Sequence, residues 1–80
     1  MFNVYILKSN KYKWYYVGLS GNVFKRLEEH NSGRVKSTKT RKPYDIIYTE
    51  SFRSRIEARK REKQMKNGSY KKRFIENLTI

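Results

Sequence analysis

The stretch that decides the fold is Tyr16-Val-Gly-Leu-Ser-Gly-Asn-Val-Phe-Lys-Arg-Leu-Glu-Glu-His-Asn-Ser-Gly33. It begins with β-prone residues and enters a glycine turn, where Gly18 lets the backbone leave the sheet or a ligand approach it closely. Asn22 or Ser20 can cap the helical pattern that follows, and residues 31–33 have the composition of a helix C-terminus. The stretch therefore predicts a strand, a turn and a short helix in immediate succession.

The helical part of this stretch has two notable faces. Val23, Phe24 and Leu27 recur at helical spacing and predict a buried apolar stripe. Arg26 and His30 are four residues apart, so they lie one turn apart on the flank of that stripe. Two interpretations stay open: they form a functional pair, or Arg26 is solvated and His30 is an exposed residue at the end of the helix, where the helix dipole favours it.

Strand character appears in three segments. Residues 2–8 and 14–18 are rich in β-branched and aromatic side chains, and the turn residues between them predict an antiparallel hairpin. Residues 44–52 predict a third strand. Alternation places three of its side chains on one face: Ile46, Tyr48 and Phe52. Ile47 would then face the other way.

Two helices are predicted after the third strand. Ser54 and Glu57 have the spacing of a capping box, which opens a helix from Arg55 to about Lys66. In this helix Ala58 and Met65 share a face, and Glu62 lies at its edge.

A last short helix over residues 69–77 would pack inward through three side chains: Tyr70, Phe74 and Leu78. The element order β-β-α-β-α-α predicts an α+β fold, a small three-stranded antiparallel sheet flanked by helices.

Length and charge restrict the function. Eighty residues predict a single domain over residues 1–80, and 20 Lys and Arg against 7 Asp and Glu give a net charge of +13. A polyanion is the expected partner, and nucleic acid fits better than a membrane because no segment has the roughly 18 consecutive apolar residues that a spanning helix needs. The chain has no cysteine, which excludes disulfides and thiolate metal sites. No N-terminal signal peptide is visible, so a cytoplasmic protein is expected.

Residues 31–43 form a basic, hydroxyl-rich segment. Its cations are Arg34, Lys36, Lys39, Arg41 and Lys42. Such side chains release counterions from a phosphate backbone, and the neighbouring Ser and Thr hydroxyls can donate hydrogen bonds to phosphate oxygens. We expect this segment to bind nucleic acid. The alternative is that the segment is a solvated, partly disordered connection in the free protein. Both interpretations hold if the segment is disordered when free and becomes ordered when it binds nucleic acid.

Five positions together resemble a known family. Asn3-Val4-Tyr5, Tyr16-Val17-Gly18, Arg26, His30-Asn31 and Glu62 occur in the order that marks the GIY-YIG nuclease superfamily, and the run from Arg26 to Gly33 is similar to its small single-domain members. The resemblance covers nearly the whole chain. One departure is Asn3, which stands where the signature has its first glycine.

The resemblance implies a metal-dependent endonuclease that hydrolyses a phosphodiester of DNA. It implies a single divalent cation, Mg²⁺ or Mn²⁺, held by Glu62. Tyr5 and Tyr16 would lie close to the scissile phosphate, Arg26 would steady that phosphate, and His30 would transfer a proton.

Physical chemistry agrees with these roles. A guanidinium such as that of Arg26 is always charged and offers two donors to two phosphate oxygens. The acidic residues form no cluster, so one carboxylate with waters and substrate suits Mg²⁺ better than a two-metal site. Which of Tyr5, Tyr16 and His30 acts as the base stays open. Glu62 has a plainer interpretation as an ion-pair partner of Lys66 or Arg59.

Alternative functions also stay open. The chain can be a non-catalytic module that binds DNA or RNA on the same scaffold, or a ribosome-associated basic protein. For the nuclease, DNA is favoured over RNA, and the expected role lies in DNA repair or recombination. Sequence specificity is expected to be low, and DNA shape or a protein partner would supply the selectivity.

Overall fold

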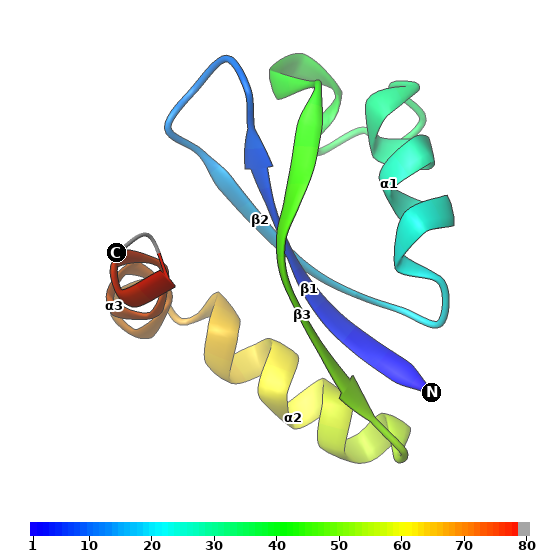
Figure 1. The fold of residues 1–80 in the computed structure, drawn as a ribbon, viewed down its shortest axis with the longest axis vertical. Helices are drawn as coiled ribbons and strands as arrows, with labels where there is room; N and C mark the ends of the chain where they lie inside the picture. Colours follow the sequence, from blue (N-terminus) through cyan, green and yellow to red (C-terminus); the bar gives the residue numbers. More distant parts are fainter. Residues whose placement is uncertain (79–80) are drawn as a thin grey trace.

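The computed structural model describes residues 1–78 and contains one antiparallel sheet and three α-helices (Figure 1). In chain order the elements are β1 (Phe2–Ser9), β2 (Tyr15–Ser20), α1 (Val23–Asn31), β3 (Tyr44–Phe52), α2 (Arg55–Lys66) and α3 (Gly68–Leu78). A short 3₁₀ helix, Lys39–Arg41, precedes β3. This confirms the predicted α+β class and the element order. Within residues 1–78, no helix has the length and apolar character needed to cross a membrane.

The central strand of the sheet is β1, in the order β2-β1-β3. α1 covers one face of the sheet, and α2 and α3 cover the other (Figure 1). Both faces of β1 are therefore covered, which is why its middle reads as an unbroken apolar run. Four consecutive side chains are at most 1% exposed: Val4, Tyr5, Ile6 and Leu7.

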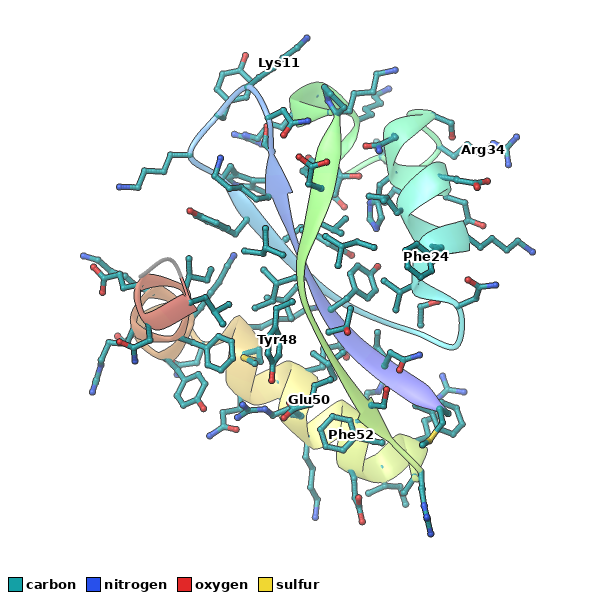
Figure 2. The ribbon with its side chains drawn as sticks, in the orientation of Figure 1. Lys11, Phe24, Arg34, Tyr48, Glu50 and Phe52 are labelled. Atoms are coloured by element: carbon teal, nitrogen blue, oxygen red, sulfur yellow. The ribbon has the colours of Figure 1, made fainter. Side chains whose placement is uncertain are left out.

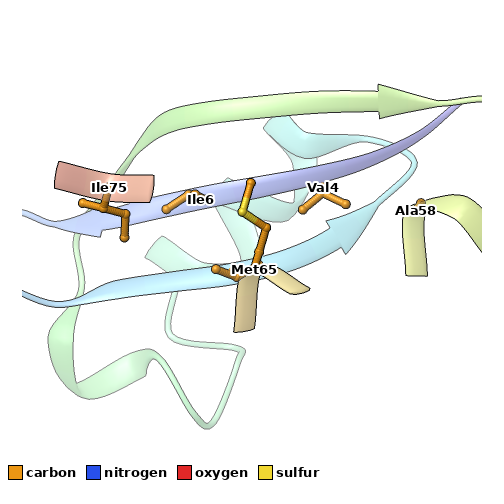
Figure 3. Packing of buried hydrophobic residues seen from close by; sticks show 6 residues of the cluster. Val4, Ile6, Ala58, Met65 and Ile75 are labelled. Carbon is orange, nitrogen blue, oxygen red and sulfur yellow. The ribbon is translucent and has the colours of Figure 1, made fainter. Parts of the chain in front are cut away.

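Two apolar clusters form because successive strand residues point to opposite faces. Toward α2 and α3, Val4 and Ile6 pack with three helical residues, Ala58, Met65 and Ile75 (Figure 3). Toward α1, the cluster consists of Tyr5, Leu7, Val23 and Tyr44. The side chain of Tyr5 therefore points to the α1 side of the sheet. Ala58 and Met65 share the buried face of α2, as predicted.

The predicted faces of β3 are partly wrong. A β-bulge interrupts its pairing with β1, so that Ile6 faces Tyr48 while Leu7 faces Ile46. Ile47 is the extra residue, and both Ile47 and Tyr48 pack toward α2 and α3, whereas Ile46 packs toward α1. An inserted residue shifts the side-chain alternation by one position, which sequence periodicity does not reveal.

Two predicted helix faces also need correction. Phe24 is 76% exposed on α1 (Figure 2), because Val23, Leu27 and His30 take the positions that face the sheet. The side chain of His30, and not that of Phe24, therefore lies on the buried side of α1. In α3, Tyr70 and Phe74 pack against the core as predicted, but the buried residue is Ile75, and Leu78 at the helix end is exposed.

The segment between α1 and β3 is ordered by hydrogen bonds. The Asn31 amide accepts from the Tyr44 backbone N–H at 2.7 Å and donates to the Tyr44 carbonyl at 3.2 Å. The Ser9 hydroxyl donates to the Arg41 carbonyl at 2.6 Å, and Thr38 is fully buried. The structure therefore contradicts a solvated connection at Thr38, whereas most other residues of the segment are exposed.

Candidate active site

A cleft of about 350 Å³ lies at the β2 edge of the sheet, between α1 and α2. Four of the five predicted site residues line it, each from a different element: Tyr5 of β1, Tyr16 of β2, Arg26 of α1 and Glu62 of α2. Because β2 is an edge strand, the cleft reaches both faces of the sheet, which allows α1 and α2 to contribute to one space.

Gly18 shapes the cleft by making room for Tyr5. The two residues face each other across the β1–β2 ladder, and the Tyr5 ring lies over the Gly18 backbone. A Cβ at Gly18 would overlap Cζ and the hydroxyl oxygen of Tyr5. The glycine therefore accommodates the phenol of Tyr5, and because Gly18 also lines the cleft, the close approach of a ligand to its backbone stays a prediction.

The Tyr5 hydroxyl lies at the inner end of the cleft. Its side chain is 1% exposed, and its oxygen lies 3.0 Å from Nε2 of His30. Burial raises the pKa of Tyr5 to about 12, despite an opposing effect from Arg26. Burial therefore favours the protonated phenol of Tyr5 at neutral pH.

His30 lies behind Tyr5, outside the lining of the cleft. It is fully buried, among the rings of Tyr5, Tyr16 and Tyr44, and its Nδ1 is 2.8 Å from Oγ1 of Thr38. Burial, together with the charge of Arg26, lowers the pKa of His30 to about 4, so the imidazole is neutral at pH 7. The interpretation of His30 as an exposed helix-end residue is wrong.

The depressed pKa of His30 predicts an acid-sensitive fold. Between pH 4 and about 6.5 the unfolded chain binds more protons at this imidazole than the folded protein does, so the free energy of unfolding should fall as the pH decreases through this range. The expected loss is up to about 3 kcal/mol, and the contribution of His30 disappears within about one pH unit above 6.5. Urea denaturation at a series of pH values measures it.

His30→Gln is the matched control for this experiment, because His30 is the only histidine in the chain. The variant should be less stable at pH 7 and should lose the decline between pH 6.5 and 4. Parallel pH profiles for the two proteins would show that this imidazole is not the group responsible.

Arg26 is held by a residue that the sequence interpretation missed. Its Nη1 donates to Oε1 of Glu29 at 2.6 Å, while 38% of the Arg26 side chain stays exposed at the cleft. The guanidinium lowers the pKa of the Glu29 carboxyl. Glu29 is three residues after Arg26, a helical spacing that signals such a pair. The ion pair orients the guanidinium, which also interacts with the Tyr5 phenol, and its remaining donors are available to a ligand.

Glu62 is the carboxylate of the cleft. Its side chain is 12% exposed, and its oxygens lie 3.2 Å from Nζ of Lys66 and 3.8 Å from Nη1 of Arg59. Both ion pairs of the plainer interpretation are thus present. Within residues 1–78 no group of three or more His, Cys, Asp or Glu side chains is placed to hold a metal. A single carboxylate in an aqueous cleft fits a divalent cation that keeps most of its waters, as Mg²⁺ does.

Two further arginines line the cleft. Arg55 and Arg59 are exposed on α2 and precede Glu62 on the same side of the helix. The sequence interpretation named Arg59 as an ion-pair partner and Arg55 as the start of the helix, and it did not place either in the site. Their spacing of four residues, with Glu62 three residues further on, is the signal that they share a helical face.

The five cations of residues 34–42 lie outside the lining of the cleft. Arg34, which extends away from the sheet beyond α1 in Figure 2, is exposed, as are Lys36, Lys39 and Lys42. Arg41 packs over the ring of Trp14 at 4.8 Å, and Trp14 stacks on Tyr16 with centroids 6.4 Å apart. Only Arg41 is therefore connected to the cleft, through two aromatic rings.

Comparison with known proteins agrees with this geometry. The model of the GIY-YIG catalytic domain matches residues 1–74. UPF0213 protein lwe0147 of Listeria welshimeri is 46% identical over 68 residues, covering 84% of this chain and 74% of that protein. UPF0213 protein YazA of Bacillus subtilis is 36% identical over 72 residues, covering 89% and 72%.

A solved structure is similar as well. The solution NMR structure of UPF0213 protein BH0048 from Bacillus halodurans matches with a TM-score of 0.58 and 30% identity, covering 95% of this chain and 84% of that chain. The converging residues, the family model and these relatives lead to one conclusion: the chain belongs to the GIY-YIG catalytic domain family.

Proposed function

We propose that this protein is a divalent-metal-dependent endonuclease that hydrolyses phosphodiester bonds in DNA with low intrinsic sequence specificity. The observation that carries the proposal is the convergence of Tyr5, Tyr16, Arg26 and Glu62 on one cleft from four separate elements. Membership of a nuclease-type family and a net charge of +13 support it.

Arg26 and Glu62 would carry the charges of the reaction. Arg26 keeps free guanidinium donors at the cleft, and these can bind two non-bridging oxygens of the scissile phosphate. Glu62 would hold the cation. A bound Mg²⁺ or Mn²⁺ would neutralise phosphate charge and favour ionisation of nearby water. Tyr16, at the wall of the cleft, would contact the same phosphate.

The Tyr5–His30 pair would remove the proton of the attacking water. Tyr5 would take a proton from that water on its oxygen while its own proton passes to Nε2 of His30, 3.0 Å away. Both groups are neutral at rest, but the exchange makes an imidazolium that the burial of His30 disfavours, so it would depend on a bound cation lowering the pKa of the attacking water. The water oxygen then bonds to phosphorus, the bond to the leaving oxygen breaks, and solvent protonates that oxygen.

The basic segment would hold the DNA outside the cleft. Replacing Lys36 and Lys39 with glutamine should weaken binding and make the salt dependence shallower, by about 0.9 in the slope of log K against log salt for each phosphate that the variant no longer neutralises. Fluorescence anisotropy over a salt series measures this slope. Lys72→Gln with Arg73→Gln, on exposed positions of α3, is the control that removes the same amount of charge. Equal slopes of log K against log salt for the two double variants would show that Lys36 and Lys39 do not contact the DNA.

Cleavage assays on a substrate panel test the proposal. Supercoiled plasmid, linear duplex, forked DNA, a four-way junction and a matched RNA are incubated with Mg²⁺, Mn²⁺ or EDTA. We expect metal-dependent cleavage of DNA, a loss of about 10³-fold or more in Glu62→Ala, and near wild-type activity in Glu57→Ala, an exposed acid on the same helix. Wild-type rates in Glu62→Ala would refute the site. Salt-sensitive binding with no cleavage under any condition would instead identify a non-catalytic binding module.

A further inference from the structure

We propose that Thr38 is a positioning residue, whose hydroxyl holds His30 in the tautomer protonated at Nδ1 so that Nε2 is left to accept the Tyr5 proton. The consequence for cleavage rests on the proposed nuclease function. The tautomer itself does not, because it follows from hydrogen bonds within the protein. Thr38 lies in the basic segment, outside the signature residues and the cleft.

The first step concerns the Thr38 hydroxyl. Thr38 is fully buried, and its Oγ1 lies 2.8 Å from Nδ1 of His30 and 3.3 Å from the carbonyl oxygen of Val35. A carbonyl can only accept, so the hydroxyl proton points toward Val35 and a lone pair of Oγ1 points toward His30. In this arrangement Nδ1 is the donor, which requires a proton on that nitrogen.

The second step starts from the other end of the imidazole. The Tyr5 hydroxyl lies 3.0 Å from Nε2, and Arg26, which also acts on this phenol, carries donors only. Among the described residues, His30 is thus the acceptor placed for the Tyr5 proton. A proton on Nε2 would make the Tyr5 oxygen the acceptor and would leave the phenol proton without this partner. The same tautomer satisfies Thr38, His30 and Tyr5 at once.

A doubly protonated imidazolium is disfavoured by the surroundings of His30. The titratable groups around it are the phenols of Tyr5, Tyr16 and Tyr44 and the Arg26–Glu29 ion pair. Burial raises the pKa of the Tyr5 and Tyr44 phenols, and the Glu29 carboxylate is already paired with Arg26 at 2.6 Å. No free negative charge in this set is available to stabilise imidazolium.

Thr38 is itself held in place from two sides. Its backbone N–H donates to Val35 at 3.1 Å, and its carbonyl accepts from the Tyr44 hydroxyl at 2.7 Å. Tyr44 begins β3 and is 1% exposed. The basic segment therefore connects the sheet to the imidazole, in addition to carrying cations.

Nitrogen-15 NMR of the single histidine tests the tautomer. The probe is the full chain labelled with ¹⁵N-histidine at pH 7, in a long-range ¹H–¹⁵N correlation of the ring, where a protonated and an unprotonated nitrogen differ in shift. We expect Nδ1–H in the wild type, in Thr38→Ser and in the control Tyr5→Phe. Thr38→Val, which has nearly the same shape but no hydroxyl, should shift the population toward Nε2–H.

Cleavage provides the second measurement. Thr38→Val should lower the rate at least about tenfold, whereas Thr38→Ser should restore it to near the wild-type rate. Nε2–H in the wild type, or an unchanged tautomer in Thr38→Val, would overturn the proposal. So would a changed tautomer with an unchanged rate.

The two proposals fail in different ways. If the wild type cleaves nothing, the nuclease function fails and the tautomer measurements alone decide the role of Thr38. If Thr38→Val does not fold, the wild-type and Thr38→Ser spectra decide it.

Discussion

Replacing Arg26 with alanine is expected to lower the rate of DNA cleavage by about 10³-fold while the protein stays folded. The guanidinium is the cation on the α1 side of the cleft, and Glu29 already orients it at 2.6 Å. In the transition state, negative charge builds up on the phosphate oxygens, and a preoriented donor stabilises it most there. Single-turnover cleavage rates measure the effect, and circular dichroism with urea denaturation checks the fold.

Two further variants separate charge from geometry at this position. Arg26→Lys keeps the positive charge but offers a single ammonium, so it should recover only part of the lost rate. Arg34→Ala, which removes an exposed cation outside the cleft, should change cleavage little at low salt. A wild-type rate for Arg26→Ala, or equal losses for Arg26→Ala and Arg34→Ala, would mean that Arg26 does not contact the scissile phosphate.

Replacing Gly18 with alanine is expected to abolish cleavage and to destabilise the fold by about 1–3 kcal/mol. The added Cβ would overlap the Tyr5 ring at its hydroxyl end, so the ring or strand β2 has to move. Either movement breaks the 3.0 Å contact between Tyr5 and His30. The free energy of unfolding in urea and the cleavage rate are the two measurements.

Gly21→Ala is the matched control, because Gly21 also lines the cleft but the nearest atom to its added Cβ is 3.8 Å away. It should leave stability and cleavage close to the wild type. In the double variant Gly18→Ala, Tyr5→Ala the overlap disappears, so its destabilisation should be smaller than the sum of the single effects. Additive effects would show that Gly18 and Tyr5 do not contact each other in this way.

The sequence by itself determined the element order and much of the candidate site. The bounds of the strands and helices and the caps at Asn22 and Ser54 are local features, and the structure confirms them within a residue or two. The signature resemblance named all four predicted residues that meet in the cleft. Periodicity alone placed Arg26 beside His30 but offered no reason to connect them with Glu62.

The tertiary structure decided what depends on contacts between distant segments. The bulge at Ile47 placed Ile47 on the face of Tyr48 and Phe52, and Ile46 on the other face. On α1, His30 is buried and Phe24 is exposed. Burial keeps His30 neutral, and its Nε2 lies beside the Tyr5 hydroxyl. Its other partner is Thr38, which belongs to a segment whose sequence predicts a surface loop. Periodicity indicates which residues share a face, whereas desolvation and hydrogen-bond partners depend on which elements pack together, and that is set only when the whole chain folds.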